Sequence, residues 1–473
     1  MKGKHHVEGL EGRTLLSGWS TVEDFNPPGS YYAEFYDVAA DAAGNVYAVG
    51  DQSSAGSAGH GIVLEKPAGS STWATLLDYG AMSFSGMGIS FNAVAVSAKG
   101  DVYVAGSAET GSGWVVLEQP AGQSGFTVVD QVSGATNPGT NTDLAIDAAG
   151  NVFAVGEVPV QVTVKTGGKT TTRNELRWTV RERAAGAASF TTVDQFVYST
   201  NWAAENYPYA VAATSTGIYV VGDVDSGGNT PEHWIVRKSA DAGATWKTVD
   251  DYQWDSASTS RAQGVAVDAA GAVYVTGEAS QRYVISTSRK GTTYGYNYRW
   301  VVRKSTDGGA TWPQSLQTSM PINTLSSEVV HFGMGTDAAG NVYAVHPQDD
   351  AAGIEHSIVR SSAAGWQPID DYQLAPGQNS EGFGFAAGPD GTLYACGYGI
   401  DAANVVHGIV RSMAGPAPAP ATQTAAGSPL FSGTPISAAS QTTLQATSST
   451  DPKKPGLRGS AKAKLEVSAC IPI

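Results

Sequence analysis

One short segment recurs seven times along this chain of 473 residues. Each copy places alternating Val, Ala and Tyr residues on both sides of a glycine, as in "DVAADAAGNVYAVG" at residue 37 and "DLAIDAAGNVFAVG" at residue 143. The glycines are Gly44, Gly100, Gly150, Gly217, Gly271, Gly340 and Gly391, and they define repeats one to seven. Their spacing of 50 to 69 residues is close to one four-stranded unit. A chain of such units must stack them, because one unit alone cannot bury its apolar face.

The recurring segment predicts two short strands joined by a tight turn. Alternating apolar residues suit a pleated, half-buried surface, and glycine supplies the positive φ of a bulged hairpin. In four repeats an aspartate starts the turn and is expected to cap it through backbone N–H groups. These aspartates are Asp41, Asp147, Asp268 and Asp337.

Two further strands follow in most repeats. Seven segments like "WIVRKSA" at residue 234 predict third strands, but only six like "WKTVDDY" at residue 246 predict fourth strands, and the copy at 312–318, "WPQSLQT", is degraded. Residues 19–25, "WSTVEDF", form a fourth strand with no unit before it. If this strand completes repeat seven, the ring closes without an exposed edge.

The predicted fold is therefore all-β. We expect a seven-bladed β-propeller of four-stranded antiparallel blades over residues 19–413, with the N-terminal strand closing the last blade. Residues 1–18 are expected to be a leader and residues 414–473 a disordered tail, because their Pro, Ala, Ser and Thr content cannot offset the entropy of ordering.

The segment Ser-x-Asp-x-Gly-x-Thr-Trp occurs twice between third and fourth strands, at residues 239–246 and 305–312. It resembles the Asp-box, or BNR repeat, of sialidase-like propellers. The first hairpin is similar to the seven-bladed propeller repeat of bacterial surface proteins and, less closely, to NHL repeats and streptogramin lyase. The resemblance implies a structural role on the side of the disc opposite an active site. The residues concerned are Ser239, Asp241, Gly243, Trp246, Ser305, Asp307, Gly309 and Trp312.

Composition limits the partners and the compartment. A formal charge of −15 and a pI near 4.9 disfavour nucleic acid. No stretch approaches the length of a transmembrane helix, and two cysteines cannot form a disulfide framework, so Cys396 is expected to be a buried thiol. "LEGRTLLS" at residues 10–17 resembles a segment that opens exported bacterial proteins. We expect an extracellular or cell-envelope monomer.

Known catalytic sets are incomplete in the sequence. Sialidase chemistry needs converging arginines, whereas the recurrent arginines lie on third strands, and we expect them to pair with acids of fourth strands such as Asp194, Asp250 and Asp370.

We expect no metal and no cofactor. A calcium ion at the acidic loop 223–229 is the alternative, although that loop lacks the closing Glu of a calcium motif. His233, His356 and His407 recur near third strands, which favours a shared packing role.

Binding residues are predicted on the variable face, where strands two and three are joined. Repeats three and five carry long insertions there, and the second insertion is basic and rich in tyrosine. Aromatic residues of this face suit stacking on sugars or a protein patch. The candidates are Tyr31, Tyr32, Trp202, Tyr207, Trp254, Tyr294 and Tyr296, with Phe35, Tyr198, Tyr283 and Tyr298 beside them.

Glu34, Glu381 and Arg261 are the candidates for chemistry. Each lies ten residues before the turn glycine of its repeat, and repeats one and seven become neighbours once the ring closes. Asp37 and Asp143 share an offset of seven residues. Facing carboxylates could split their pKa values and act as acid and base, or they could simply cap strand ends.

Two functions remain open from the sequence. The first is a non-enzymatic surface propeller that binds a glycan or protein through its aromatic face. The second is a carbohydrate-active enzyme, a glycoside hydrolase or lyase, with acids at the mouth of the channel.

Overall fold

The computed structural model describes residues 18–54, 59–80, 88–108, 113–133, 143–166, 169–199, 201, 204–228, 230–289, 291–313, 318–322 and 332–415. This part of the chain is all-β, and its one helical element is a short 3₁₀ turn at Ser362–Ala364. The sequence prediction of an all-β chain is confirmed.

Each repeat contributes strands in the same order. The first strands are β2 (Ser30–Ala40), β6 (Ile89–Val96), β10 (Asp143–Ile146), β14 (Asn206–Thr214), β18 (Ser260–Val267), β22 (Gly333–Thr336) and β26 (Ser380–Ala387). The second strands are β3 (Val46–Ser54), β7 (Val102–Ala108), β11 (Val152–Thr166), β15 (Gly217–Val224), β19 (Val273–Ser288), β23 (Val342–Asp349) and β27 (Thr392–Ile400). The third strands are β4 (His60–Lys66), β8 (Gly113–Gln119), β12 (Lys169–Arg183), β16 (His233–Ser239), β20 (Gly291–Ser305), β24 (Glu355–Ser361) and β28 (Val406–Ala414).

Fourth strands complete the sheets. They are β5 (Ala74–Tyr79), β9 (Thr127–Ser133), β13 (Thr191–Phe196), β17 (Lys247–Tyr252), β21 (Thr318–Ile322) and β25 (Pro368–Tyr372). In repeat five the fourth strand begins at Thr318, later than the predicted segment 312–318, in which Pro313 has no N–H to donate to a ladder. The N-terminal strand β1 (Ser20–Phe25) pairs antiparallel with β28, with Phe25 opposite Gly408.

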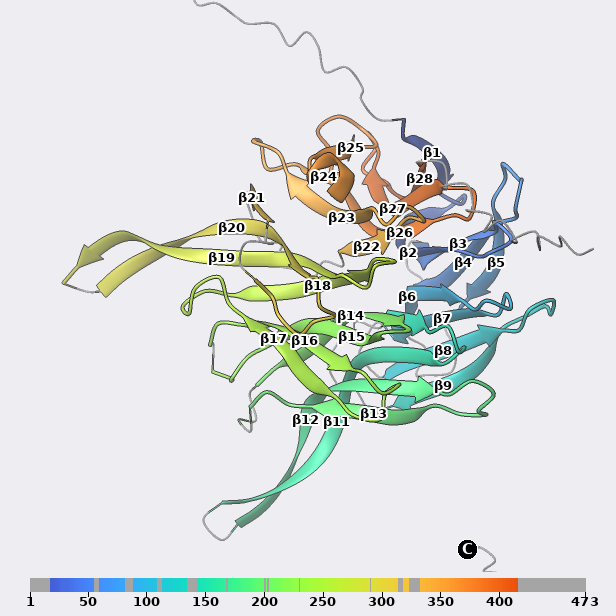
Figure 1. Ribbon diagram of the computed structural model, residues 1–473. Coiled ribbons are helices and arrows are strands. Elements are labelled where there is room, and N and C mark those ends of the chain that lie inside the picture. The colour runs from blue at the N-terminus through green and yellow to red at the C-terminus, as the bar shows by residue number, and fades with distance from the viewer. Residues whose placement is uncertain are drawn as a thin grey trace, which may run out of the picture. The chain divides into compact units, whose positions relative to one another are not determined.

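The sheets form antiparallel units whose first strands lie innermost (Figure 1). Five sheets have four strands each, and an eight-stranded sheet joins repeats seven and one through a single parallel bridge between Tyr32 and Val406. The first strands contact one another in the order β2, β6, β10, β14, β18, β22 and β26, and β26 contacts β2 again. This gives a propeller-like arrangement in which each sheet packs face to face on the next.

The apolar core lies between neighbouring sheets. In the described residues, seven buried clusters each combine side chains of consecutive repeats, such as Trp234 of repeat four with Val275 of repeat five, and one of them also includes Phe383 of a third repeat. Glycine makes this approach possible, because a Cβ on Gly277 would lie 3.0 Å from the ring of Trp234 and closer still to the backbone of Arg261. In repeat six His346 replaces that glycine and stacks on Trp300, with the ring centroids 5.0 Å apart.

The third-strand arginines join consecutive repeats. Arg237 forms a bidentate pair with Asp194 of the preceding repeat, at 2.7 and 2.9 Å, and both side chains are about 10% exposed or less. The same pairing joins Arg181 to Asp130, Arg303 to Asp250 and Arg411 to Asp370. The expected acids therefore do pair with the arginines, but each acid lies on the sheet of the preceding repeat and not on the sheet of its arginine. Face-to-face packing of the two sheets brings these positions together.

Three interfaces depart from this pattern, and in the one between repeats seven and one Leu64 takes the arginine position and Glu23 the aspartate position. Between repeats one and two the corresponding residues are Leu77 and Leu117, which belong to one apolar cluster.

Between repeats five and six Thr318 takes the acid position, because it lies opposite Val302 as Asp250 lies opposite Val236 in repeat four. Arg360 there donates instead to His346 Nε2 at 2.9 Å and to Gln348 at 2.6 Å. The contacts made at this third-strand position thus depend on the residue that the preceding repeat places opposite it.

The two Ser-x-Asp-x-Gly-x-Thr-Trp segments form closely similar turns. The Ser239 hydroxyl donates to Asp241 and accepts the Gly243 N–H, and the Asp241 carboxylate accepts the N–H and hydroxyl of Thr245. Ser305, Asp307, Gly309 and Thr311 repeat these bonds. Trp246 and Trp312 pack against the cores between repeats three and four and between repeats four and five, respectively. Hydrogen bonding to Thr311 lowers the pKa of Asp307 to about 2.

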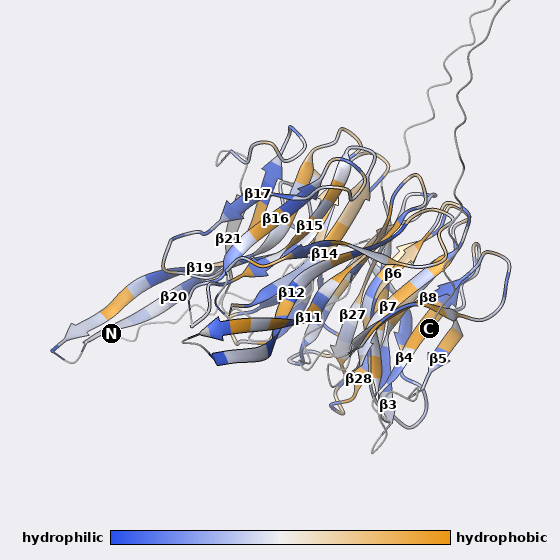
Figure 2. Cartoon of the chain, turned by 90° about the horizontal axis from the view of Figure 1, so that it is seen from below, coloured by the Kyte–Doolittle hydropathy of each residue, from blue (hydrophilic) through white to orange (hydrophobic). Residues whose placement is uncertain are grey.

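The insertions of repeats three and five are long two-stranded hairpins. They are the outer halves of β11–β12 and β19–β20, and both extend beyond the sheets in a similar direction (Figures 1 and 2). Their outer residues are mostly exposed, unlike the buried inner halves of the same strands.

Deleting residues 18–25 should destabilise the protein strongly. Trp19 is 6% exposed, Phe25 packs on Phe35 at 5.7 Å between ring centroids, and Trp73 donates to the Val22 carbonyl. Each large apolar side chain that becomes exposed costs ~1.5–3 kcal/mol, so the free energy of unfolding should fall by several kcal/mol in a urea titration. An unchanged unfolding midpoint would show that β1 contributes nothing to the fold.

Replacing Asp194 with Ala should cost about 3–5 kcal/mol, because Arg237 is then a buried charge without its partner. The double variant Arg237→Leu with Asp194→Leu should recover most of that loss, since it copies the apolar pair found between repeats one and two. Urea unfolding of the two single variants and the double variant measures the coupling. Additive losses would contradict a direct contact between the two sheets.

Candidate functional site

The first and second strands of each repeat form a hairpin, and in every repeat except six the second strand contains a glycine such as Gly50. The residue that follows this glycine lies at the same end of the hairpin as Glu34, Arg261 and Glu381 do in their repeats. The hairpin register places Glu34 opposite Asp51, Arg261 opposite Glu278 and Glu381 opposite Tyr398. A register shift one or two residues further along sets these pairs apart from the regular ladder. The local fold therefore gathers ionisable side chains at one end of the first strands.

The first group, which we name the seven–one group, combines side chains of repeats seven and one with Glu355 of repeat six. Its members are Glu34, Glu381, Asp51, Glu355, Tyr32, Tyr36 and Tyr398. The Tyr36 hydroxyl donates to Glu34 Oε2 at 2.9 Å, and the Tyr398 hydroxyl donates to Glu381 Oε1. The Tyr32 hydroxyl donates to Asp51 Oδ2 at 2.7 Å.

Burial makes Glu381 an unusual acid. Burial first, and then the neighbouring carboxyls of Glu355 and Glu34, raise the pKa of Glu381 to about 8, while Tyr398 opposes them. The pKa of Tyr398 is also raised well above its ordinary value by burial and by Glu381. Glu34 and Glu381, predicted as neighbours from their equal offsets, do lie within range of each other's charge. The raised pKa favours the protonated form of Glu381.

The second group, the three–five group, combines side chains of repeats three, four and five. It contains Glu157, Glu205, Asp223, Glu232, Glu278 and Arg261, with Tyr207 and Tyr209. Arg261 pairs with Glu232 through Nε and, at 3.0 Å, through Nη2, and its Nη1 lies 3.6 Å from Glu278. One guanidinium thus faces several carboxyls.

Most carboxyls of the three–five group are held away from water. Glu157, Asp223 and Glu278 are 3% exposed or less, and burial is the largest cause that raises the pKa of each. For Glu278 the pKa reaches about 7, with Glu232 acting in the same direction and Arg261 opposing. Within the described residues, neither oxygen of Glu157 has a hydrogen-bond partner. This group is a costly arrangement of buried acids.

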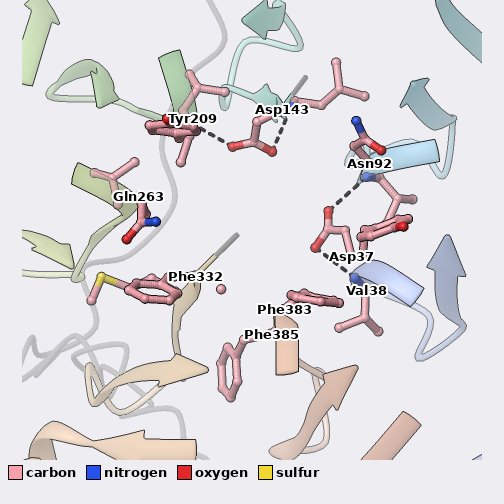
Figure 3. Close-up of a pocket in the computed structure, with 18 residues that line it drawn as sticks. Asp37, Val38, Asn92, Asp143, Tyr209, Gln263, Phe332, Phe383 and Phe385 are labelled. Carbon is pink, nitrogen blue, oxygen red and sulfur yellow. Dashed lines mark hydrogen bonds between the residues drawn. The ribbon is translucent and has the colours of Figure 1, made fainter. Parts of the chain in front are cut away.

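A cavity of about 210 Å³ lies among the first strands of all seven repeats. Tyr36 and Tyr209, which belong to the two acidic groups, both contribute to its wall. Figure 3 shows Phe332, Phe383 and Phe385 on one side of the cavity and Asp37, Asn92 and Asp143 on the other. The cavity therefore has an apolar half and an acidic half.

Asp37 and Asp143 fasten neighbouring first strands. Asp37 accepts the Val38 N–H at 2.8 Å and the Val94 N–H of the next repeat at 2.9 Å. Asp143 accepts the Leu144 and Val211 N–H groups in the same way (Figure 3). Burial, and then the charge of Asp143, raise the pKa of Asp37 to about 8.

Glycines occupy the position of Asp37 in repeats five to seven. A Cβ on Gly384 would lie 2.8 Å from the Asp37 Cα, and Gly264 and Gly333 likewise face the backbone of the next first strand. Direct contact between strands replaces the carboxylate bridge there. The bridging role explains the shared offset of Asp37 and Asp143 without catalysis.

The predicted aromatic residues separate into different environments. Tyr32 and Tyr207 belong to the acidic groups, whereas Tyr294 and Tyr296 lie on the β20 hairpin and are 41% and 46% exposed. Tyr31 is exposed on β2, and Trp254 is half-buried below the guanidinium of Arg299, 4.9 Å from its ring centroid. Trp202 lies outside the described residues. Phe35 is fully buried, so its predicted place among binding residues is wrong.

Sequence reasoning missed Asp51, Glu157, Asp223 and Glu278. Each directly follows the glycine that ends the copies of the recurring segment, as in "AVGD" and "VTGE". This recurrence was a signal, because a residue that repeats at one position of each unit lies at one end of the assembly. Tyr398 holds the same position in repeat seven, after Gly397, whereas Tyr36 and Glu232 carry no comparable pattern.

The loop proposed for calcium is held by other contacts. Asp225 accepts the N–H groups of Glu205 and Gly227 at 2.7 and 2.9 Å, while Asp223 is part of the three–five group. The part of the chain that the structure describes contains no group of three or more His, Cys, Asp or Glu residues arranged to hold a metal ion. His233, His356 and His407 each bond an aspartate of a fourth strand, at 2.6–2.7 Å.

Two features bear on the partners and the redox state. No helix of the described chain is long and apolar enough to cross a membrane. Cys396 is a buried free thiol, and burial raises its pKa well above the ordinary value.

Comparison with known proteins finds remote likenesses only. No family model matches the chain, and no curated protein matches it. A polysaccharide lyase described as a PL25 ulvan lyase has a TM-score of 0.48 at 10% identity, covering 82% of this chain and 95% of its own. The α-L-arabinofuranosidase Arb93A from Fusarium graminearum has a TM-score of 0.41 at 11% identity, covering 67% and 91%. The β-propeller domain of the Trilobed protease from Pyrococcus furiosus has 0.43 at 9%, covering 81% and 96%. At these TM-scores the likenesses carry no argument about activity.

Replacing Arg261 with Met should destabilise the protein by about 3 kcal/mol, since Glu232 loses its partner in a site that is about three-quarters buried. The raised pKa of Glu278 already lowers stability as pH rises from about 4.5 to about 7, because the unfolded chain releases that proton first. Without the guanidinium this pKa rises further, so the deficit should be larger at pH 8 than at pH 6 in urea titrations. Arg183→Met, which breaks the pair with Glu118, is the control and should show no such pH dependence.

Proposed function

We propose that this protein is a carbohydrate-active enzyme of the glycoside hydrolase type, with Glu381 as general acid and Glu34 as general base. The observation that carries the proposal is that Glu381, whose pKa burial raises, lies within range of the charge of Glu34, although the two residues come from opposite ends of the repeat region. Two carboxyl groups whose environments separate their pKa values are the usual equipment for cleaving a glycosidic bond. Both side chains are half-buried.

The tyrosines of the seven–one group position the two acids. Tyr398 donates to Glu381 Oε1 and holds the carboxyl whose proton passes to the leaving oxygen. Tyr36 donates to Glu34 Oε2 and holds the carboxylate that takes a proton from the attacking water. The bond between the anomeric carbon and the leaving oxygen breaks as the water adds. Both tyrosines also restrict rotation of the acids, which general acid–base catalysis requires.

The proposal includes a seven-bladed propeller in which β1 completes the last blade. The pairing of β1 with β28, the cyclic contacts of the first strands and the apolar clusters between consecutive repeats support this architecture. The Ser-x-Asp-x-Gly-x-Thr-Trp turns serve as folding elements, supported by hydrogen bonds that stay within each turn.

A second candidate is a binding module without catalysis. The exposed tyrosines Tyr294 and Tyr296 favour it, because they offer a contact surface that is separate from the acids. The first candidate is preferred because acids held with strongly raised pKa values are costly, and such costs concentrate at catalytic sites.

Assaying the full chain on a panel of neutral and acidic polysaccharides tests the proposal by release of reducing ends. Glu381→Gln and Glu34→Gln should each lower kcat by about 10²–10⁴-fold. The rate should fall as pH rises through about 8, because Glu381 must be protonated to act.

Glu65→Gln is the matched control, since Glu65 lies on β4 opposite Tyr47, away from the seven–one group. This variant should keep full activity. Activity that survives in both Glu381→Gln and Glu34→Gln would exclude the seven–one group. A chain that cleaves no member of the panel would favour the binding module.

A further inference from the structure

The two hairpin insertions carry charge opposite to that of the rest of the protein. In the sequence of the second insertion, residues 279–299 contain four basic residues and no acid. The sequence of the first insertion, residues 158–177, contains four basic residues and one acid. The net charges of the two segments are therefore +4 and +3 in a chain of −15. Positive charge is thus concentrated on the two elements that extend furthest from the sheets (Figure 1).

One face of the β19–β20 hairpin carries a row of tyrosines. Tyr294, Tyr296 and Tyr298 alternate along β20 and therefore point to the same side of the ribbon. The rings of Tyr296 and Tyr298 are nearly parallel, with centroids 6.4 Å apart and planes at 18°. Arg282 pairs with Tyr296 across the ribbon, and its guanidinium lies 4.3 Å from the ring centroid of Tyr294.

Exposure of this row is unusual for a monomeric surface. Tyr294 and Tyr296 are 41% and 46% exposed, and neighbouring Val284 is 58% exposed. Contiguous exposed apolar side chains of this kind mark interaction sites. Tyrosine suits such a role because its ring presents a flat apolar face and its hydroxyl remains in water.

We propose that this tyrosine row and Arg282 form a binding platform for a linear anionic polysaccharide, one bearing carboxylate or sulfate groups. Sugar rings lie on the tyrosine faces, while Arg282 and Arg289 meet the anionic groups. The basic β11–β12 hairpin adds attraction at longer range. The assignment of the ligand to polysaccharides rests on the proposed function, whereas its negative charge follows from the hairpins themselves.

The acidic groups near the inner strands are compatible with such a ligand. Burial keeps part of their carboxyls protonated, so an anionic chain meets less negative charge there than the sequence suggests. Nucleic acid also offers flat rings and negative charge, but the remaining surface is strongly acidic and repels a long polyanion. A second copy of this chain is the other possible occupant, since its acidic sheets complement the hairpins.

Binding is measured on the full chain by isothermal titration with oligogalacturonate, sulfated dextran and neutral dextran at two salt concentrations. We expect both anionic ligands to bind and neutral dextran to bind at least 10-fold more weakly. Added salt should weaken the anionic complexes. A preference for one anionic ligand identifies whether carboxylate or sulfate is the natural group.

Variants locate the platform. Tyr294→Ala with Tyr296→Ala should weaken binding by at least 10-fold, Tyr294→Phe with Tyr296→Phe should retain it, and Arg282→Gln should reduce its salt dependence. Tyr283→Ala is the matched control, because Tyr283 is equally exposed but covers Gly295 on the opposite face of the same hairpin. Thermal unfolding confirms that each variant is folded.

The outcomes separate this inference from the proposed catalysis. Glu381→Gln should bind the anionic ligand as the original chain does, so binding without cleavage keeps the platform and rejects the enzyme. Equal affinity for neutral and anionic dextran, or unchanged affinity in the double Ala variant, would overturn the platform. So would tighter binding of single-stranded DNA, or a dimer that the Tyr294→Ala, Tyr296→Ala variant abolishes.

Discussion

Face-to-face packing of consecutive sheets is the contact on which the other features of this protein depend. No sheet has enough apolar surface on one side to be stable alone, and each buried cluster draws its side chains from consecutive repeats. The same interfaces include one polar position, where a third-strand side chain meets the fourth strand of the preceding repeat. Bidentate Arg–Asp pairs at four interfaces and a Leu–Leu pair at another are two solutions to one geometric problem.

This packing also decides where ionisable groups meet. Since every first strand starts at the same end of its sheet, residues with equal offsets in different repeats converge there. Glu34 and Glu381 come together because repeats one and seven are neighbours, and Glu157, Asp223 and Glu278 do so through three consecutive repeats. Removal of these carboxyls from water raises their pKa values and lowers the free energy of unfolding. Apolar packing between the sheets offsets this loss.

The hairpin extensions do not have to pack against a neighbouring sheet. Beyond the sheets, the outer halves of β11–β12 and β19–β20 have no neighbouring sheet to match, so charge and exposed rings can change there without loss of core packing. The result is a division between an acidic, tightly packed interior end and basic arms. Strands β11 and β19 each carry an acid of the three–five group at the inner end and continue into a basic hairpin at the outer end. The acidic groups and the basic hairpins are therefore connected through the same strands.

The sequence by itself determined the all-β class, the repeat boundaries, the capped turns and the hydrogen-bonding segments at Ser239 and Ser305, because these features depend on backbone preferences within a few residues. It also indicated that Glu34 and Glu381 have equivalent positions. Only the tertiary structure decided that the third-strand arginines pair with the preceding sheet, that Asp37 bridges to Val94, and that burial raises the pKa of Glu381 beside Tyr398. These outcomes depend on how one sheet is rotated against the next and on how far water is excluded between them, and neither quantity is encoded within a single repeat.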